Sequence, residues 1–186
     1  CYEFDLKTVT GYRKKILAAP IKDGKAVLEQ LAGQRREEAE DDDLDWAEEV
    51  LGEMEGGYDN CRFSCYWDSD TNMTYPLILA KIPVKNPWDI FAYLPFGNWN
   101  ECPDTPELMA AAKYWFEQYG AVPAAMTHDE LEFELPAPIS KEKAMEAATE
   151  QYGFCPDIVD QEQDDPTVGN LADVLWQSTV WYFWWD

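Results

Sequence analysis

A chain of 186 residues with 37 acidic side chains against 14 basic ones has a formal net charge of −23, and this charge limits what it can bind. Nucleic-acid phosphates and anionic membrane surfaces are recognised by clustered Lys and Arg, so neither is expected as a direct ligand, whereas a basic protein partner suits the charge. An apolar content of 46% supports a folded core, and no apolar run is long enough to cross a bilayer.

The chain contains five cysteines, at positions 1, 61, 65, 102 and 155. Their odd number and irregular spacing differ from those of a small disulfide-bonded secreted scaffold, so we expect free thiols in a reducing, cytoplasmic compartment. A mature lipoprotein also begins with cysteine, which makes lipidation of Cys1 the alternative. The sequence indicates no cofactor.

Residues 1–75 are predicted to form an N-terminal strand followed by an acidic helical region. Residues 2–9 alternate in the manner of a strand, and residues 25–36 carry apolar side chains at helical spacing. Eleven acids occur among the nineteen residues 37–55. After a solvated linker, the apolar residues of 41–54 recur every three or four positions, which predicts an amphipathic helix with an acidic outer face.

Two strands are predicted next, over residues 61–67 and 74–82, around a turn-rich loop. Cys61 and Cys65 would share one face of the first strand and pack there. Asn86 followed by proline predicts a helix start, because Asn caps helices and Pro is favoured in the first turn.

The second half of the chain mixes helices with hairpin strands. In order, the expected elements are a helix over 105–119, strands over 122–126 and 131–135, helices over 140–152 and 167–177, and a strand over 179–185. Glu132 and Glu134 alternate with apolar neighbours, which predicts one solvated face on the hairpin. The aromatic last strand is expected to be covered on both faces. This pattern predicts an α+β fold with a mixed or mainly antiparallel sheet flanked by helices.

Strings of scarce residues in this half carry a resemblance to a known family. They include Tyr-Leu-Pro-Phe-Gly (93–97), Trp-Asn-Glu-Cys-Pro (99–103), Thr-His-Asp (127–129), Phe-Cys-Pro-Asp-Ile-Val (154–159) and Trp-Tyr-Phe-Trp-Trp-Asp (181–186). Over about residues 76–186 the chain resembles a bacterial family known as domain of unknown function 4253. The resemblance implies a family-like domain over 76–186 and a bacterial origin, and it implies no activity.

The same strings supply the candidate site residues. Cys102, His128 and Cys155 are the candidate metal ligands or catalytic groups, because thiolates and imidazole bind zinc and a histidine can activate a thiol nucleophile. The candidate binding residues are Trp99, Glu101, Asp129, Asp157 and Asp160. The alternative is structural: buried free thiols behave as small apolar groups, and loop carboxylates bond their own backbone.

Three functional hypotheses follow. The first is a non-catalytic acidic module, immunity-type or regulatory, that binds a protein partner of basic character. The second is a hydrolase or metal-binding protein centred on the cysteines and the histidine. The third is a nucleic-acid mimic, in which the acidic helix occupies the DNA-binding surface of a partner.

Overall fold

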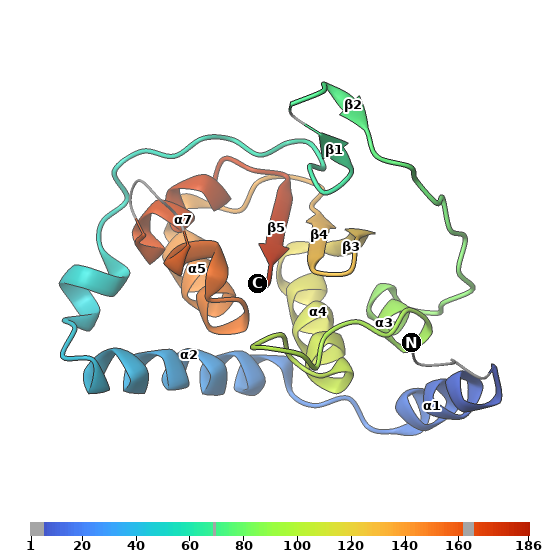
Figure 1. Cartoon of the computed structure of the whole chain (residues 1–186). Coiled ribbons are helices and arrows are strands. Elements are labelled where there is room, and N and C mark those ends of the chain that lie inside the picture. The colour runs from blue at the N-terminus through green and yellow to red at the C-terminus, as the bar shows by residue number, and fades with distance from the viewer. Residues whose placement is uncertain (1–5, 69, 162–165) are drawn as a thin grey trace.

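The computed structural model describes residues 6–68, 70–161 and 166–186 (Figure 1). Its helices are α1 (Leu6–Ala18), α2 (Gly24–Asp41), a π-helical turn (Trp46–Leu51), a 3-10 turn (Pro87–Asp89), α3 (Ile90–Tyr93), α4 (Thr105–Tyr119), α5 (Lys141–Phe154), α6 (Asp157–Asp160) and α7 (Val168–Leu175). Its strands are β1 (Trp67–Asp68), β2 (Met73–Thr74), β3 (Val122–Met126), β4 (Glu130–Glu134) and β5 (Val180–Trp184). None of the helices in these ranges is both long and apolar enough to cross a membrane.

The fold is α+β, as the sequence predicts. Strands β3, β4 and β5 form an antiparallel sheet in that order, with Phe133 of β4 opposite Trp181 of β5. Strands β1 and β2 form a separate two-stranded hairpin. In Figure 1, β5 runs between the pair α5 and α7 on one side and β4 on the other, while α2 passes below them.

The core is centred on the fully buried Trp115 of α4. Its indole ring lies within 5.7 Å, centroid to centroid, of the rings of Phe133, Phe154, Trp181 and Phe183. Offset and edge-to-face aromatic pairs of this kind add to the stabilisation from apolar burial. The face of the last strand that carries Trp181 and Phe183 is therefore buried, whereas Tyr182 and Trp184 on the other face are only partly buried, so the predicted cover on both faces is incomplete.

Local signals in the second half were read correctly. Helix α4 begins at a capping box. The Asp104 carboxylate accepts a hydrogen bond from the Glu107 backbone N–H at 2.9 Å, and the Glu107 carboxylate accepts one from the Asp104 backbone N–H at 3.3 Å. It ends at Gly120, whose φ of 74° is the left-handed geometry that glycine adopts without strain. Helix α5 continues to Phe154, two residues past its predicted end.

The N-terminal predictions were largely wrong. Residues 6–9 open helix α1 rather than continuing a strand; the rest of that prediction, residues 2–5, lies outside the described residues. Helix α2 extends through the expected linker as far as Asp41. The amphipathic helix predicted over 41–54 is reduced to the single π-helical turn, which Asp45 caps by accepting from two backbone N–H groups.

In place of the strands predicted over 61–67 and 74–82, the structure has only β1 and β2, each two residues long. A strand needs a neighbour for its backbone hydrogen bonds, and most of both segments lies outside the sheets. Residues 71–81 are all exposed and form an extended arm beyond β1 (Figure 1). Cys61 is exposed and Cys65 buried, so the expected shared strand face is also wrong.

Part of the N-terminal half is built into the core of the second half. Helix α2 packs against α4 and α5, and its Leu28 is fully buried in the common apolar cluster. Glu132 of β4, expected on a solvated face, is fully buried instead. Its carboxylate accepts from the Ser64 backbone N–H at 2.7 Å, the Ser64 hydroxyl at 3.0 Å and the Cys65 backbone N–H at 3.3 Å. The segment around residue 64 thus covers the face of the hairpin that was expected to meet water.

Candidate functional site

Three of the rare-residue strings, residues 99–103, 154–159 and 181–186, converge at the end of the chain. The Cys155 thiol donates to the Trp184 backbone carbonyl at 3.0 Å, and the Asp186 backbone N–H donates to the Asp157 carboxylate at 3.0 Å. The side-chain amide of Asn100 donates to the Asp186 backbone carbonyl. Residues from all three strings therefore take part in these hydrogen bonds, which hold the last strand against α6 and the 99–103 loop.

The two candidate thiols lie inside this arrangement. Cys102 and Cys155 are both buried. Burial raises the pKa of Cys102 to about 12, and burial raises the pKa of Cys155 well above its ordinary value. A thiol becomes a strong nucleophile or metal ligand only when it loses its proton. Both side chains therefore act as small apolar groups in the core.

His128 lies elsewhere, at the tip of the β3–β4 hairpin. Its side chain is 90% exposed, and its Nδ1 atom lies 3.0 Å from the Asp129 carboxylate. An imidazole that faces solvent cannot also contact two buried thiols, so the structure does not bring the three candidate groups to one point. Within residues 6–68, 70–161 and 166–186, no group of three or more His, Cys, Asp or Glu side chains is arranged to hold a metal ion.

Two of the candidate carboxylates gather instead around an arginine of α2. Arg35, only 14% exposed, pairs with Glu101 at 2.6 Å and with Glu38 at 2.8 Å. Asp160 lies in the same cluster. Its pKa is raised by partial burial, and this rise is opposed by a hydrogen bond from Tyr152 and by the charge of Arg35. This cluster connects helix α2 to the rare-residue loops.

Trp99 has a structural position. Its ring packs partly buried against the core, and its backbone carbonyl accepts from the Cys102 backbone N–H at 3.0 Å, which closes the loop between them.

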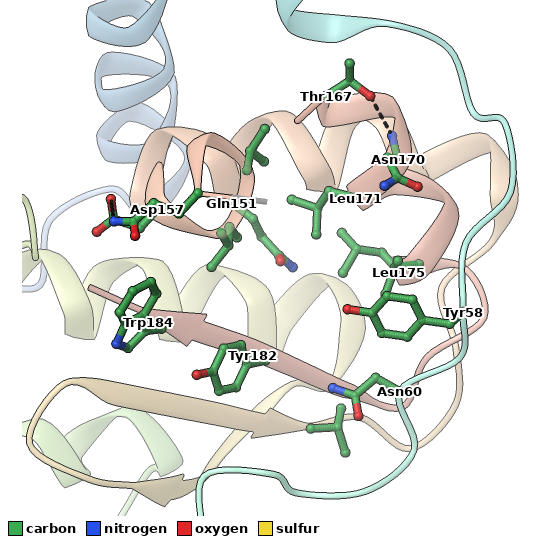
Figure 2. Close-up of a pocket in the computed structure, with 15 residues that line it drawn as sticks. Tyr58, Asn60, Gln151, Asp157, Thr167, Asn170, Leu171, Leu175, Tyr182 and Trp184 are labelled. Carbon is green, nitrogen blue, oxygen red and sulfur yellow. Dashed lines mark hydrogen bonds between the residues drawn. The ribbon is translucent and has the colours of Figure 1, made fainter. Parts of the chain in front are cut away.

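A pocket lined in part by Asp157 lies on the face of β5 that carries Tyr182 and Trp184 (Figure 2). This face is opposite to the one that packs against Trp115. Its cavity volume is about 220 Å³. Helices α5, α6 and α7 form one side, and β5 forms the other through Val180, Tyr182 and Trp184. The N-terminal segment supplies a third wall with Tyr58 and Asn60. The Asn60 backbone is fixed there, since its carbonyl accepts from the Val180 backbone N–H at 3.0 Å.

Gln151 of α5 is the unusual group in this pocket. Its side chain is fully buried, and neither its amide nitrogen nor its amide oxygen has a hydrogen-bond partner among the described residues. Figure 2 shows the amide directed into the space between Leu171 and Leu175 of α7 and the ring of Tyr182. The Tyr182 hydroxyl itself donates to Glu130 at 2.8 Å.

Sequence analysis did not identify Gln151, although a signal was present. The buried face of α5 carries Ala144, Ala147, Ala148 and Gln151, whose positions i, i+3, i+4 and i+7 form one helical stripe. A glutamine at the end of an otherwise alanine stripe marks a polar group directed into the protein. The other pocket walls could not be inferred, because they come from three separate parts of the chain.

Comparison with known proteins gives one finding. A family model described as Domain of unknown function (DUF4253) matches residues 78–186, which include the rare-residue strings and most of the pocket. No curated protein and no solved structure matched the chain in the corresponding searches.

Proposed function

The chain belongs to the DUF4253 family, which is defined only by a domain of unknown function, and from the properties of its own surface we propose that it is a non-catalytic module that binds a basic protein partner. The buried, protonated thiols and the solvent-facing histidine give little support to a Cys–His reaction centre. The acidic surface is then the feature that most needs a functional explanation.

One observation carries this proposal: the acidic segment, residues 37–55, keeps all eleven of its carboxylates exposed. Within the part of the chain that the structure describes, Glu38 pairs with Arg35 and Glu40 pairs with Arg36. No other acid of the segment forms an ion pair with a described residue. Its negative charge is therefore largely uncompensated.

Such a surface acts mainly on association. Complementary charge accelerates diffusional encounter and suppresses wrong partners more than it adds affinity. Carboxylates on the last turn of α2 and the loop after it would face the Lys and Arg side chains of a partner. Occupying a basic protein surface in this way would suit a regulatory or immunity-type role.

The test compares two variants of equal net charge. In the first, Asp41, Asp42 and Asp43 are changed to Asn, which the backbone accepts because Asn tolerates the positive φ of 59° at position 43. Binding to lysozyme and to cytochrome c, used as basic probes, is measured by biolayer interferometry at low and high salt. We expect weaker binding by about tenfold at low salt and little difference at high salt.

The control variant changes three exposed acids outside the segment, Asp70, Glu134 and Glu142, to their amides. If the acidic segment is the binding surface, this control loses much less affinity than the segment variant. Equal losses in the two variants would show that only total charge matters. Binding that does not respond to salt would also contradict the proposal.

A further inference from the structure

The buried amide of Gln151 has an energetic consequence. A primary amide in water makes hydrogen bonds through its oxygen and its two N–H donors, and burying it without partners forfeits them. Buried polar side chains in folded proteins are overwhelmingly partnered. Here both amide atoms are inaccessible and without a partner among the described residues. A methionine at this position would fill a similar space without the cost.

A ligand in the pocket beside the amide can supply the missing partners once the Gln151 side chain turns toward it, because both amide atoms are inaccessible in the free protein. With a cavity volume of about 220 Å³, it is smaller than the pockets that hold drug-sized ligands, so its ligand must be small. Leu171 and Leu175 lie on one side of the amide, and the rings of Tyr182 and Tyr58 lie on the others (Figure 2). Apolar and aromatic walls around a single polar point favour a flat ligand whose ring contacts the walls.

The charge of the lining restricts the ligand further. The described lining residues include no Lys or Arg, and their one charged side chain is the carboxylate of Asp157. The chain as a whole carries a net charge of −23. A phosphate or carboxylate in this pocket would therefore lack a counter-ion and would be repelled, which excludes anionic ligands. The Asp157 carboxylate already accepts from the Gln161 side chain and the Asp186 backbone N–H, and the Gln151 amide carries no charge for a cation, so an uncharged ligand fits the site best.

We propose that this pocket is a binding site for a small, uncharged, planar molecule with an amide edge, such as a lactam heterocycle or an aromatic carboxamide. The Gln151 amide presents a donor and an acceptor side by side. An amide edge on the ligand presents the complementary acceptor and donor, so the two can form paired hydrogen bonds. This site is separate from the acidic segment and does not depend on the proposed protein partner.

The experiment titrates the full chain with uracil as the probe, by isothermal titration calorimetry. We expect saturable binding with one site and a dissociation constant on the order of 1 mM or tighter. Two related molecules serve as ligand controls. In 1,3-dimethyluracil the N–H donors are blocked, and uridine monophosphate adds a charged phosphate, so both should bind at least about tenfold more weakly.

Two protein variants complete the test. Gln151→Met should reduce uracil affinity by about tenfold or more without lowering the melting temperature of the free protein, because it removes an unpaired buried amide. Gln118→Met makes the same change at an exposed position of α4 and should alter neither quantity. The expected pattern is loss of binding in the first variant alone.

Two results would overturn the proposal. The first is no detectable binding of uracil, which would mean that water alone satisfies Gln151. The second is binding that is equal in Gln151→Met and the unaltered chain. If Gln151→Met failed to fold, the comparison of uracil with 1,3-dimethyluracil on the unaltered chain would decide the question, and equal affinity for the two would refute an amide-specific site.

Discussion

The sharpest stability prediction concerns Glu132, the buried carboxylate that fixes the segment around residue 64 to strand β4. It accepts three hydrogen bonds, two from Ser64 and one from the Cys65 backbone. Burial is the main cause that raises the pKa of the Cys65 thiol, and the Glu132 carboxylate raises it further. The thiol therefore stays protonated beside Glu132. We predict that Glu132→Gln destabilises the protein strongly although it changes neither size nor shape.

The magnitude follows from the three bonds. The glutamine oxygen can still accept from Ser64, but a hydrogen bond to a charged acceptor contributes about 1 kcal/mol more than one to a neutral acceptor, and two such bonds are weakened. The new NH₂ group faces the Cys65 N–H, which leaves that buried donor unsatisfied at a cost of about 1–3 kcal/mol. After allowance for the lower cost of burying a neutral group, we expect about 2–4 kcal/mol, or roughly 5–15 °C in melting temperature.

The assay is urea unfolding followed by circular dichroism, with Glu134→Gln as the matched control on the same strand. Glu134 is exposed and has no hydrogen bond from the N-terminal segment, so its substitution should stay within about 0.5 kcal/mol. Limited proteolysis adds a local readout, since releasing Ser64 should speed cleavage near it. A Glu132→Gln variant as stable as the control would refute the argument that these bonds hold the two halves together.

Three further predictions concern packing, titration and thiol reactivity. Gly153→Ala should lower the free energy of unfolding by about 1–3 kcal/mol, because a Cβ there would lie 2.5 Å from a backbone nitrogen of α2. Gly33→Ala is the control: its Cβ would meet nothing within 4 Å, so this variant should be neutral or stabilising in a thermal melting assay of both proteins. Burial raises the pKa of Glu150, so the folded state keeps this proton up to a higher pH than the unfolded chain does. The contribution of this carboxyl to the free energy of unfolding therefore falls as the pH rises above 4.5. Glu150→Gln should flatten the pH dependence of the melting temperature between that pH and neutrality. In a Cys1→Ser background, a thiol reagent should label the exposed Cys61 quickly and Cys102 only after unfolding, as mass spectrometry of labelled peptides would show; fast labelling of Cys102 in the folded protein would contradict its burial.

Sequence reasoning was accurate where the signals were local. The helix predicted over 105–119 and the strand predicted over 131–135 both formed at or within one residue of their predicted positions, because a helix cap, a terminal glycine and apolar alternation each act over a few residues. Such patterns determine structure without reference to distant parts of the chain.

The failures arose where distant partners decide the outcome. The apolar spacing of 41–54 suggested a long helix, but after the left-handed turn at Asp43 the chain forms only one helical turn and then runs toward β5. Residues 74–82 have a strand-like composition, yet among the described residues Thr74 alone of them lies in a paired strand, opposite Trp67. Glu132 was expected in solvent because its alternation alone cannot reveal that Ser64, 68 positions earlier, covers it.

The candidate site was predicted unevenly for the same reason. The scarce residues of the three strings do meet, and Glu101 and Asp160 share the environment of Arg35. Chemistry was assigned to Cys102 and Cys155 from residue type alone, and residue type does not reveal burial. Gln151 was overlooked because an amide without a partner can be recognised only once its surroundings are known.

The exposed arm after β2 has a consequence for how the molecule could be divided. Ile78 is 93% exposed and Leu79 is fully exposed, so a protease can reach the backbone between them. The helix that supplies Leu28 and the segment that bonds Glu132 lie before this point, while α4, α5 and the three-stranded sheet lie after it. A single cut would leave both sets of contacts intact, which makes the chain suited to reassembly from two separately produced fragments.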